Sequence, residues 1–219
     1  MQCMESAPNA GRAGLAPDPR LAIAKYRRLA AGYDASARRS MGLRRRAIGM
    51  LALVPGDTVI DVACGTGLSL PLLRQAVGPR GRVVGVEVSP EMLAIARTRC
   101  AGWDNVSLIE APAEEADLGT KFDAALFNYT HDVLQSPAAL ERLFSFARPG
   151  ARVAIAGVKH PPAWLFPLRL YRLLKARPYV TTLSGLDRPW HLIEGYLANL
   201  RVRSVMLGTN YLASGSTKG

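Results

Sequence analysis

The feature that most constrains the fold is an apolar run at residues 59–67 that ends in two glycines. Its residues, Val-Ile-Asp-Val-Ala-Cys-Gly-Thr-Gly, are typical of a buried strand followed by a turn in which bare backbone can approach a ligand. A second apolar strand, residues 83–86, ends at Glu87, twenty residues after Gly67. Two such strands with a helix between them predict half of a nucleotide-binding βαβ unit, in which the acid accepts ribose hydroxyls.

Two residues of this unit argue against a dinucleotide as the ligand. A pyrophosphate-binding loop has a small residue three positions after its second glycine, where this chain has Leu70. Asp61 lies at the mouth of the loop, where its charge would repel a diphosphate but suits an ammonium group. The pattern therefore favours S-adenosylmethionine, which joins an adenosine to an amino acid and contains no phosphate.

Two further segments complete the pattern. The helix start Ser89–Leu93 follows the second strand, and Phe122-Asp123 opens another apolar strand. With these, the chain resembles the class I S-adenosylmethionine-dependent methyltransferases, in particular the ubiquinone/menaquinone-biosynthesis-like and phospholipid N-methyltransferase-like group. The resemblance spans residues 20–214 and implies an α/β, Rossmann-like seven-stranded sheet in the order 3-2-1-4-5-7-6. Its last strand would be antiparallel, with helices on both faces.

The length and composition predict one main domain, because 219 residues with 49% apolar content can bury a sizeable core. We expect a mobile N-terminal tail at residues 1–19, a single methyltransferase domain at 20–214 and a C-terminal tail at 215–219. Within the domain, residues 20–54 would form a helical cap and residues 159–190 a lid insertion.

Localisation and metal content are predicted from what the sequence lacks. There is no run of eighteen apolar residues and no leader-like start, which predicts a cytoplasmic protein, with peripheral association at the inner membrane surface as an open alternative. Three scattered cysteines, Cys3, Cys64 and Cys100, predict reduced thiols rather than disulfides or a zinc site. No metal is expected, and Cys64 should pack as a small apolar side chain.

Apolar runs alternate with helical periodicity along the domain, as a parallel sheet covered by helices requires. Glycine and proline turns separate them, and a Gly-Thr-Asn turn near the end predicts a hairpin. The predicted helices are 20–31, 42–53, one that ends at Val77, 90–100 and 137–147, and the predicted strands are 59–62, 83–86, 106–109, 123–127, 151–157, 202–207 and 211–214.

The cofactor site should be assembled at the carboxyl ends of the strands. Bare backbone at Gly65 and Gly67 would contact the methionine part of the cofactor, and Asp61 would bind its ammonium group directly or through water. Val88 and Met92 are placed to pack on adenine, although Met92 is equally suited to the helix core. The predicted cofactor-binding residues are Asp61, Ala63, Gly65, Gly67, Glu87, Val88, Met92, Ala113 and Asn128.

One position departs from the family pattern. Relatives often carry an acid after strand three, which binds the adenine amino group, followed by a small residue. Here Pro112 stands where that acid is usually found, so the contact through the acid is in question. Ala113 still has a backbone N–H that can donate to the adenine ring.

Candidate catalytic residues follow the fourth strand, at Tyr129 and His131. In-line displacement at a sulfonium depends mainly on alignment, so a base is required only for an acceptor such as a phenol or an alcohol. His131 could be that base, a hydrogen-bond donor to the substrate, or a helix-start residue bonded to its own loop. Tyr33 and Asp34 resemble a Tyr-Asp pair of quinone-biosynthesis relatives, which implies that Tyr33 closes over the methyl donor.

Basic residues gather outside the catalytic core. Residues 1–46 contain ten Lys and Arg against three acids, and residues 159–203 contain eight against two. Such a fringe would attract an anionic acceptor, a lipid headgroup layer or a nucleic acid, although a merely solvated basic surface is an alternative. The arginines at 38–39 and 44–46 recur at helical spacing, so a simple exposed helix side is one interpretation of them.

The lid insertion contains a distinctive amphipathic stretch. Residues 164–175 combine a broad apolar arc with Arg169, Arg172 and Lys175 three residues apart. This pattern is typical of a lid over an acceptor pocket and also of a helix at a membrane interface. Both interpretations favour an apolar or amphipathic acceptor.

The sequence therefore predicts methyl transfer from S-adenosylmethionine to a small hydrophobic or anionic acceptor by in-line displacement. A phospholipid-headgroup N-methyltransferase at an anionic membrane surface is an alternative. From another class, an RNA-modifying or a catalytically silent cofactor-binding protein is also open. The apolar character of the aromatic-rich segment argues against nucleic acid as a partner. The oligomeric state is left undetermined.

Overall fold

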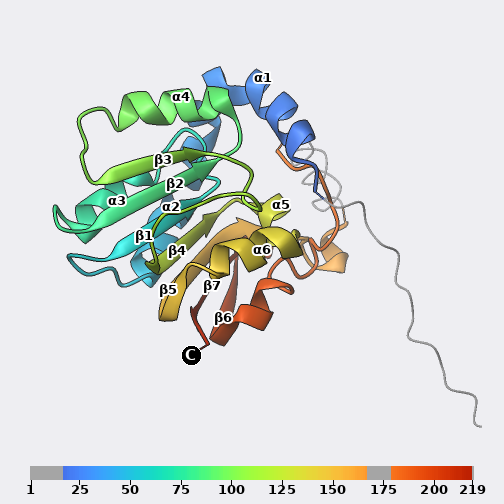
Figure 1. Cartoon of the computed structure of the whole chain (residues 1–219). Coiled ribbons are helices and arrows are strands. Elements are labelled where there is room, and N and C mark those ends of the chain that lie inside the picture. Colours follow the sequence, from blue (N-terminus) through green and yellow to red (C-terminus); the bar gives the residue numbers. More distant parts are fainter. Residues whose placement is uncertain (1–16, 167–178, 219) are drawn as a thin grey trace, which may run out of the picture.

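The computed structural model describes residues 17–166 and 179–218. A seven-stranded sheet runs in the order β3-β2-β1-β4-β5-β7-β6, with β7 antiparallel to both neighbours (Figure 1). The predicted strand order and α/β class are confirmed. The strands are β1 (Thr58–Val62), β2 (Arg82–Glu87), β3 (Val106–Glu110), β4 (Phe122–Asn128), β5 (Ala147–Val158), β6 (Leu197–Val205) and β7 (Asn210–Thr217). The α-helices are α1 (Pro19–Ala37), α2 (Met41–Met50), α3 (Leu70–Val77), α4 (Pro90–Arg99), α5 (His131–Leu134) and α6 (Pro137–Phe144), and the 3-10 helices are η1 (Arg38–Ser40), η2 (Ala163–Leu165) and η3 (Ile193–Tyr196).

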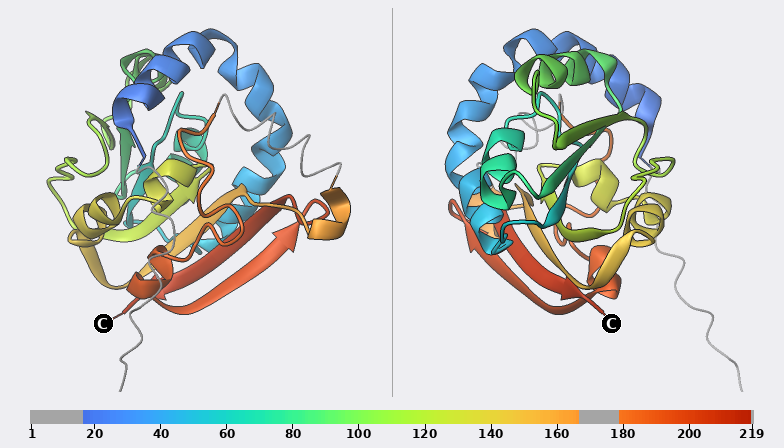
Figure 2. Two further views of the ribbon diagram at one scale, coloured as in Figure 1. Left: turned by 90° about the vertical axis from the view of Figure 1, so that its right-hand side faces the viewer. Right: turned by 60° about the vertical axis from the view of Figure 1, so that its left-hand side comes forward.

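Helices cover both faces of the sheet (Figure 2). One face packs against α2, α3 and α4, and the other packs against α5, α6 and η3. Successive residues of a strand point to opposite faces, so Val59 joins the first core and Ile60 the second. Both faces of the central strands are therefore dry, which explains why these strands are continuous apolar runs.

Helix α1 begins at Pro19, one residue before its predicted start, and ends later than predicted. The Asp18 carboxylate accepts the backbone N–H of Arg20, and Pro19 occupies the first helical turn. The helix then passes Gly32, whose Cα faces open space, and continues to Ala37 rather than to residue 31. Its last turns are held by contacts with the glycine loop, which local sequence does not reveal.

Two other elements, α6 and β7, also end at residues different from those predicted, because of hydrogen bonds with residues distant in sequence. Helix α6 stops at Phe144 rather than at residue 147, because the carbonyl of Phe146 accepts the N–H of Phe122 as β5 begins. Strand β7 reaches Thr217, beyond the predicted end at 214. The Thr217 hydroxyl donates to the carbonyl of Arg148. The predicted tail boundary at 215 therefore falls inside a strand.

The remaining domain predictions fall partly outside the described residues. Residues 1–16 contain most of the predicted mobile tail, and residues 167–178 contain the centre of the predicted lid, including Arg169, Arg172 and Lys175. These predictions stay as they are.

Gly67 is expected to be essential for packing. It has φ +78°, and an added Cβ would lie 2.8 Å from Leu70 Cδ1 and 3.1 Å from Ala96 Cβ. Gly67→Ala should therefore lower the free energy of unfolding by about 3 kcal/mol, from backbone strain plus overlap. Urea unfolding followed by circular dichroism would measure it. Gly102→Ala is a matched control, because Gly102 has φ +77° with open space around it and should lose only about 1 kcal/mol. Equal losses in the two variants would contradict the packing role.

Candidate active site

Buried polar atoms without partners mark the site. Within the described chain, seven buried side-chain nitrogen and oxygen atoms have no hydrogen-bond partner. Buried polar atoms are normally paired, so a group of unpaired ones indicates a place where a ligand completes the bonding. The residues that carry them are Arg44, Asp61, Asn128, Thr130, His131 and Thr181, around the carboxyl edge of β1 and β4.

Glu87 ends β2 and is tied to the glycine loop. Its Oε2 accepts the backbone N–H of Gly65 at 2.9 Å, and its Oε1 accepts that of Ser89 at 2.8 Å. Burial raises the pKa of the carboxyl, while the N–H groups of Ser89, Gly65 and Val88 act to lower it. Each oxygen has a further lone pair, so the carboxylate can also accept two hydroxyl donors.

A small cavity of about 70 Å³ adjoins Glu87. It is also lined by Pro17 and Asp18 just before α1, by Pro19 and Ala22 at the start of α1, and by Thr181 of the segment after residue 178. Four of the predicted cofactor residues meet here, namely Ala63, Glu87, Val88 and Ala113.

The two loop glycines differ in what they face. An ideal Cβ built at Gly65 (φ +59°) would lie 4.0 Å from Tyr33 Cε1, its nearest neighbour, so this backbone is open toward α1. The Cβ direction of Gly67 is filled by Leu70 and Ala96 instead. Met92 is fully buried in α4. Cofactor contact by Gly67 and Met92 stays a prediction.

Asp61 lies beneath the loop, in a buried polar network with α2. It is fully buried, and desolvation raises its pKa to about 7, against the lowering influence of Arg44 and of a hydrogen bond with Ser69. Arg44 Nη1 donates to Ser69 Oγ at 2.8 Å. Asp61 Oδ2 and Arg44 Nε lack partners, so the network offers one acceptor and one donor to a ligand.

Arg44 corrects the sequence interpretation. One interpretation of the arginines at 44–46 was an exposed helix side, but Arg44 is buried while Arg45 and Arg46 are exposed. Helical spacing could have found it, because the buried face of α2 consists of Leu43, Arg44, Ala47 and Ile48.

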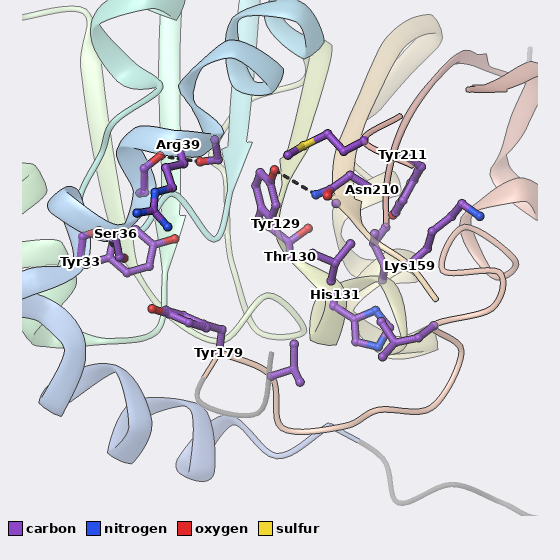
Figure 3. A pocket seen from close by; sticks show the side chains of 18 of the residues that line it. Tyr33, Ser36, Arg39, Tyr129, Thr130, His131, Lys159, Tyr179, Asn210 and Tyr211 are labelled. Carbon is purple, nitrogen blue, oxygen red and sulfur yellow. Dashed lines mark hydrogen bonds between the residues drawn. The ribbon is translucent and has the colours of Figure 1, made fainter. Parts of the chain in front are cut away.

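A second, larger cavity of about 560 Å³ contains all three predicted catalytic residues, Tyr33, Tyr129 and His131. Figure 3 shows Tyr33, Ser36, Arg39 and Tyr179 on one side of it, and Tyr129, His131, Lys159 and Tyr211 on the other. The walls combine tyrosine rings with polar and charged side chains, among them Arg39, His131 and Lys159. Such a mixture can hold an aromatic ring and also orient its polar groups.

The orientation of His131 defines its tautomer. A carbonyl can only accept, so the 2.9 Å contact between His131 Nε2 and the carbonyl of Ser184 requires a proton on Nε2. Burial lowers the pKa of the imidazole below its usual value, against the raising influence of Asp132 and of this hydrogen bond. The ring is therefore neutral near pH 7, and its buried Nδ1 carries an unpaired lone pair.

Asp132 fixes the segment that carries Ser184. Its carboxylate accepts the backbone N–H of Thr181 at 2.8 Å and also that of Thr182. Consecutive residues at the start of α5 therefore both bind the chain after residue 178. This cross-link, rather than the local sequence, orients the imidazole.

Tyr129 and Tyr33 approach the cavity from opposite sides. Tyr129 has φ +63°, a conformation that bulky residues rarely adopt, and its hydroxyl accepts from Asn210 Nδ2 at 3.3 Å. The Tyr33 ring meets those of Tyr26 and Tyr179 edge-on, with centroids 6.3 and 6.4 Å away. Burial raises the pKa of Tyr33, so the phenol is neutral.

Asp34 joins α1 to the glycine loop. Its Oδ1 accepts from Thr66 Oγ1 at 2.6 Å, and its Oδ2 pairs with Arg99 Nη2 at 2.5 Å. Arg99 also donates to the carbonyl of Thr66. These bonds hold the Tyr33-Asp34 pair over the loop.

Metal ligands do not gather in the described residues, among which no group of three or more His, Cys, Asp or Glu could hold an ion. Cys64 and Cys100 are free thiols packed in the core.

Comparisons with known proteins agree with this geometry. A family described as "Methyltransferase domain" matches residues 53–176. The 2-phytyl-1,4-naphtoquinone methyltransferase of Thermosynechococcus vestitus is 33% identical over 145 residues, which cover 63% of this chain and 64% of that protein. The demethylmenaquinone methyltransferase of Tropheryma whipplei is 32% identical over 130 residues, covering 58% and 53%. A solved SAM-dependent methyltransferase from Aquifex aeolicus superposes with a TM-score of 0.60 at 25% identity, over 91% of this chain and 98% of that one.

The sheet order, the glycine loop and the acid that ends β2 define a nucleoside-binding α/β domain. Since the family match extends over more than half of its length, the chain belongs to the methyltransferase family and is a class I S-adenosylmethionine-dependent methyltransferase. The curated relatives named above are methyltransferases that act on naphthoquinone-type compounds or demethylmenaquinone. The resemblance predicted from the sequence is confirmed. The chain spans between about half and two thirds of the length of the curated relatives named here.

Proposed function

We propose that the protein transfers the methyl group of S-adenosylmethionine to a small hydroxylated aromatic acceptor of the quinol type. The observation that carries this proposal is that His131 lines a tyrosine-rich cavity of about 560 Å³ and has a buried Nδ1 without a hydrogen-bond partner. Such a base suits an acceptor that must lose a hydroxyl proton before it reacts. The names of the quinone-related relatives support the same class of acceptor.

The residues beside the glycine loop fit the donor. Glu87 would accept the ribose hydroxyls, Asp61 the ammonium group, and Arg44 would pair with the carboxylate. The orphaned atoms of Asp61 and Arg44 support these assignments, because each is a buried group that lacks its complement. When bound, S-adenosylmethionine supplies an electrophilic methyl group on a sulfonium.

The nucleoside part requires some opening of the structure. The cavity beside Glu87 is about 70 Å³, whereas ligand pockets typically measure about 300–1,000 Å³. The start of α1 and Thr181 line this cavity together with Glu87, and we propose that one of them moves aside when the nucleoside binds. Closure afterwards would exclude water from the site.

The residues of the larger cavity handle the acceptor. His131 Nδ1 would take the proton of the acceptor hydroxyl, while Nε2–H stays bonded to the Ser184 carbonyl. The resulting phenolate carries negative charge on its oxygen and its ring carbons. Attack through oxygen would form the methyl ether with release of S-adenosylhomocysteine, whereas attack through a ring carbon would also require loss of the proton on that carbon. Tyr33, Tyr129 and Tyr179 would hold the ring in line, which is the main contribution to the rate of a displacement.

The direct test is methyl transfer from isotope-labelled donor to a panel of acceptors. We expect label in naphthoquinols and benzoquinols, and none in their oxidised forms, because a quinone has no hydroxyl proton to give. Transfer only to phosphatidylethanolamine would favour the phospholipid alternative. Tight binding of S-adenosylhomocysteine without transfer to any acceptor would favour a catalytically silent protein.

Arg44 gives a prediction about the donor site. Arg44→Gln should weaken S-adenosylhomocysteine binding about 10-fold to 100-fold, since a buried charge-assisted bond to the carboxylate is lost. Asp61 needs its charge to bind an ammonium group, and Arg44 holds its pKa down from still higher values. Wild-type affinity should therefore fall as the pH drops through about 7, and this fall should occur at higher pH in the variant.

Calorimetry across a pH series would measure both effects. Arg45→Gln removes the same charge from the exposed neighbouring position and should leave affinity and pH dependence unchanged. An unshifted pH profile in Arg44→Gln would contradict the coupling to Asp61.

A further inference from the structure

We propose that four exposed apolar residues beside the larger cavity, Trp164, Phe166, Met206 and Leu207, form a docking surface for an anionic membrane. This surface is called the apolar rim. The proposal goes beyond methyl transfer, because it concerns a binding partner and does not depend on which acceptor is methylated.

The rim is unusually exposed and contiguous. The exposed fractions are 78% for Trp164, 67% for Phe166, 56% for Met206 and 78% for Leu207. Trp164 and Phe166 lie on and after η2, and Met206 and Leu207 form the β6–β7 turn. An added Cβ at Gly208 would lie 2.8 Å from Pro162 Cδ, so these two segments touch. Figure 2 shows η2 beside the tip of the β6–β7 hairpin.

The backbone conformation of the β6–β7 turn is unfavourable for the two side chains that it carries. Met206 has φ +52° and Leu207 has φ +55°, where hairpin turns favour Gly, Asn or Asp. The protein thus holds two large apolar side chains in a strained conformation and exposes both to water. A local rule broken without a gain in the folded chain indicates a functional site.

Met206 connects the rim to the larger cavity, and basic residues lie on that cavity and on β6. Met206, Lys159 and Arg39 all line that cavity, and Arg203 lies near the end of β6. Within the described part of the chain, no ion pair involves Arg39, Lys159 or Arg203. Apolar side chains edged by unpaired cations are the combination that binds an anionic lipid surface.

The net charge of the chain also argues against a second copy of the chain as the partner that covers the apolar rim. The net charge is +11, so two copies that met through this basic-edged face would repel each other. No helix in residues 17–166 or 179–218 has the length and hydrophobicity to cross a bilayer. The proposed contact is therefore with the membrane surface.

The test is flotation of the full-length protein with vesicles of phosphatidylcholine, with or without phosphatidylglycerol. Wild-type protein should float with the anionic vesicles, and less so at high salt. The double variant Met206→Asn, Leu207→Asn should bind about 10-fold more weakly, since two large apolar side chains leave the interface. Its thermal unfolding temperature should equal or exceed that of wild type, because asparagine tolerates positive φ.

Matched controls lie away from the rim, near the amino ends of β1 and β2. Val54→Asn replaces a residue that is 54% exposed, and it should bind like wild type. Arg203→Gln should weaken binding, whereas Arg82→Gln, which removes the same charge at the start of β2, should not. S-adenosylhomocysteine binding should be unchanged in every variant, which separates failure at the rim from failure of the donor site.

Two results would overturn the proposal. One is a wild-type protein that does not float with anionic vesicles, or a double variant that floats equally well. The other is concentration-dependent self-association that the double variant abolishes, without vesicle binding, which would make the rim a contact between copies.

Discussion

Glu87→Ala is expected to weaken the binding of S-adenosylhomocysteine by about 100-fold to 10,000-fold, the result of losing two hydrogen bonds to a charged acceptor at about 1.5–3 kcal/mol each. The buried carboxylate accepts the N–H groups of Gly65 and Ser89, so its loss also releases the backbone that lines the site. Isothermal titration calorimetry on the purified variant would measure the change.

Glu110→Ala is the matched control. Glu110 ends the neighbouring strand β3, directly beside Glu87 in the sheet register, but its carboxylate is exposed and pairs with Arg97. Its loss should leave ligand affinity within about twofold, because exposed pairs contribute little. Urea unfolding of both variants would separate a binding defect from a folding defect. Equal affinities in a folded Glu87→Ala protein would remove the ribose assignment.

Most strands and helices could be predicted because local sequence patterns determine them in this sheet. Continuous apolar runs indicated strands covered on both faces, and the cap Ser89 with Pro90 marked the start of α4. The order of strands came from resemblance rather than from any local signal. Boundaries failed at α6 and β7, where hydrogen bonds from distant residues, such as Phe122 and Ala151, decide where an element ends.

The same distinction applies to the site. Glu87 and the glycine loop were found because one βαβ unit contains them both. Arg44 was missed because three adjacent arginines were treated alike, although only one lies on the buried face of α2. The tautomer of His131 depends on a carbonyl 53 residues away in the chain, and Asp132 holds that segment in place. No spacing rule links such residues before the fold is known.

The rim shows a different limit. Hydrophobicity alone did not distinguish Met206 and Leu207, which were predicted to end a strand within residues 202–207. In the structure they form the turn itself, with positive φ and exposed side chains. The interpretation of Met206 and Leu207 as part of an exposed surface depends on their φ angles and on the neighbouring η2. Neither can be predicted from the residues adjacent in sequence.

His131→Gln is expected to lower kcat with a quinol acceptor by about 100-fold to 10,000-fold, the usual contribution of a general base. A glutamine amide can still donate to the Ser184 carbonyl, so the segment after residue 178 should keep its anchor. It has no basic nitrogen, however, and cannot take the hydroxyl proton. The affinity for S-adenosylhomocysteine should be unchanged, because His131 lines the acceptor cavity rather than the cavity beside Glu87.

The pH profile distinguishes a base from a structural residue. The reactive form of His131 is the neutral imidazole, and burial lowers its pKa below the usual 6.5. Wild-type kcat should therefore be flat near pH 7 and fall tenfold per pH unit below that lowered pKa, whereas the variant should lack this limb. His191→Gln is the control, since His191 is exposed and bonded within its own loop, and it should behave as wild type. A His131→Gln enzyme that kept both its rate and its acidic limb would show that the proton leaves by another route.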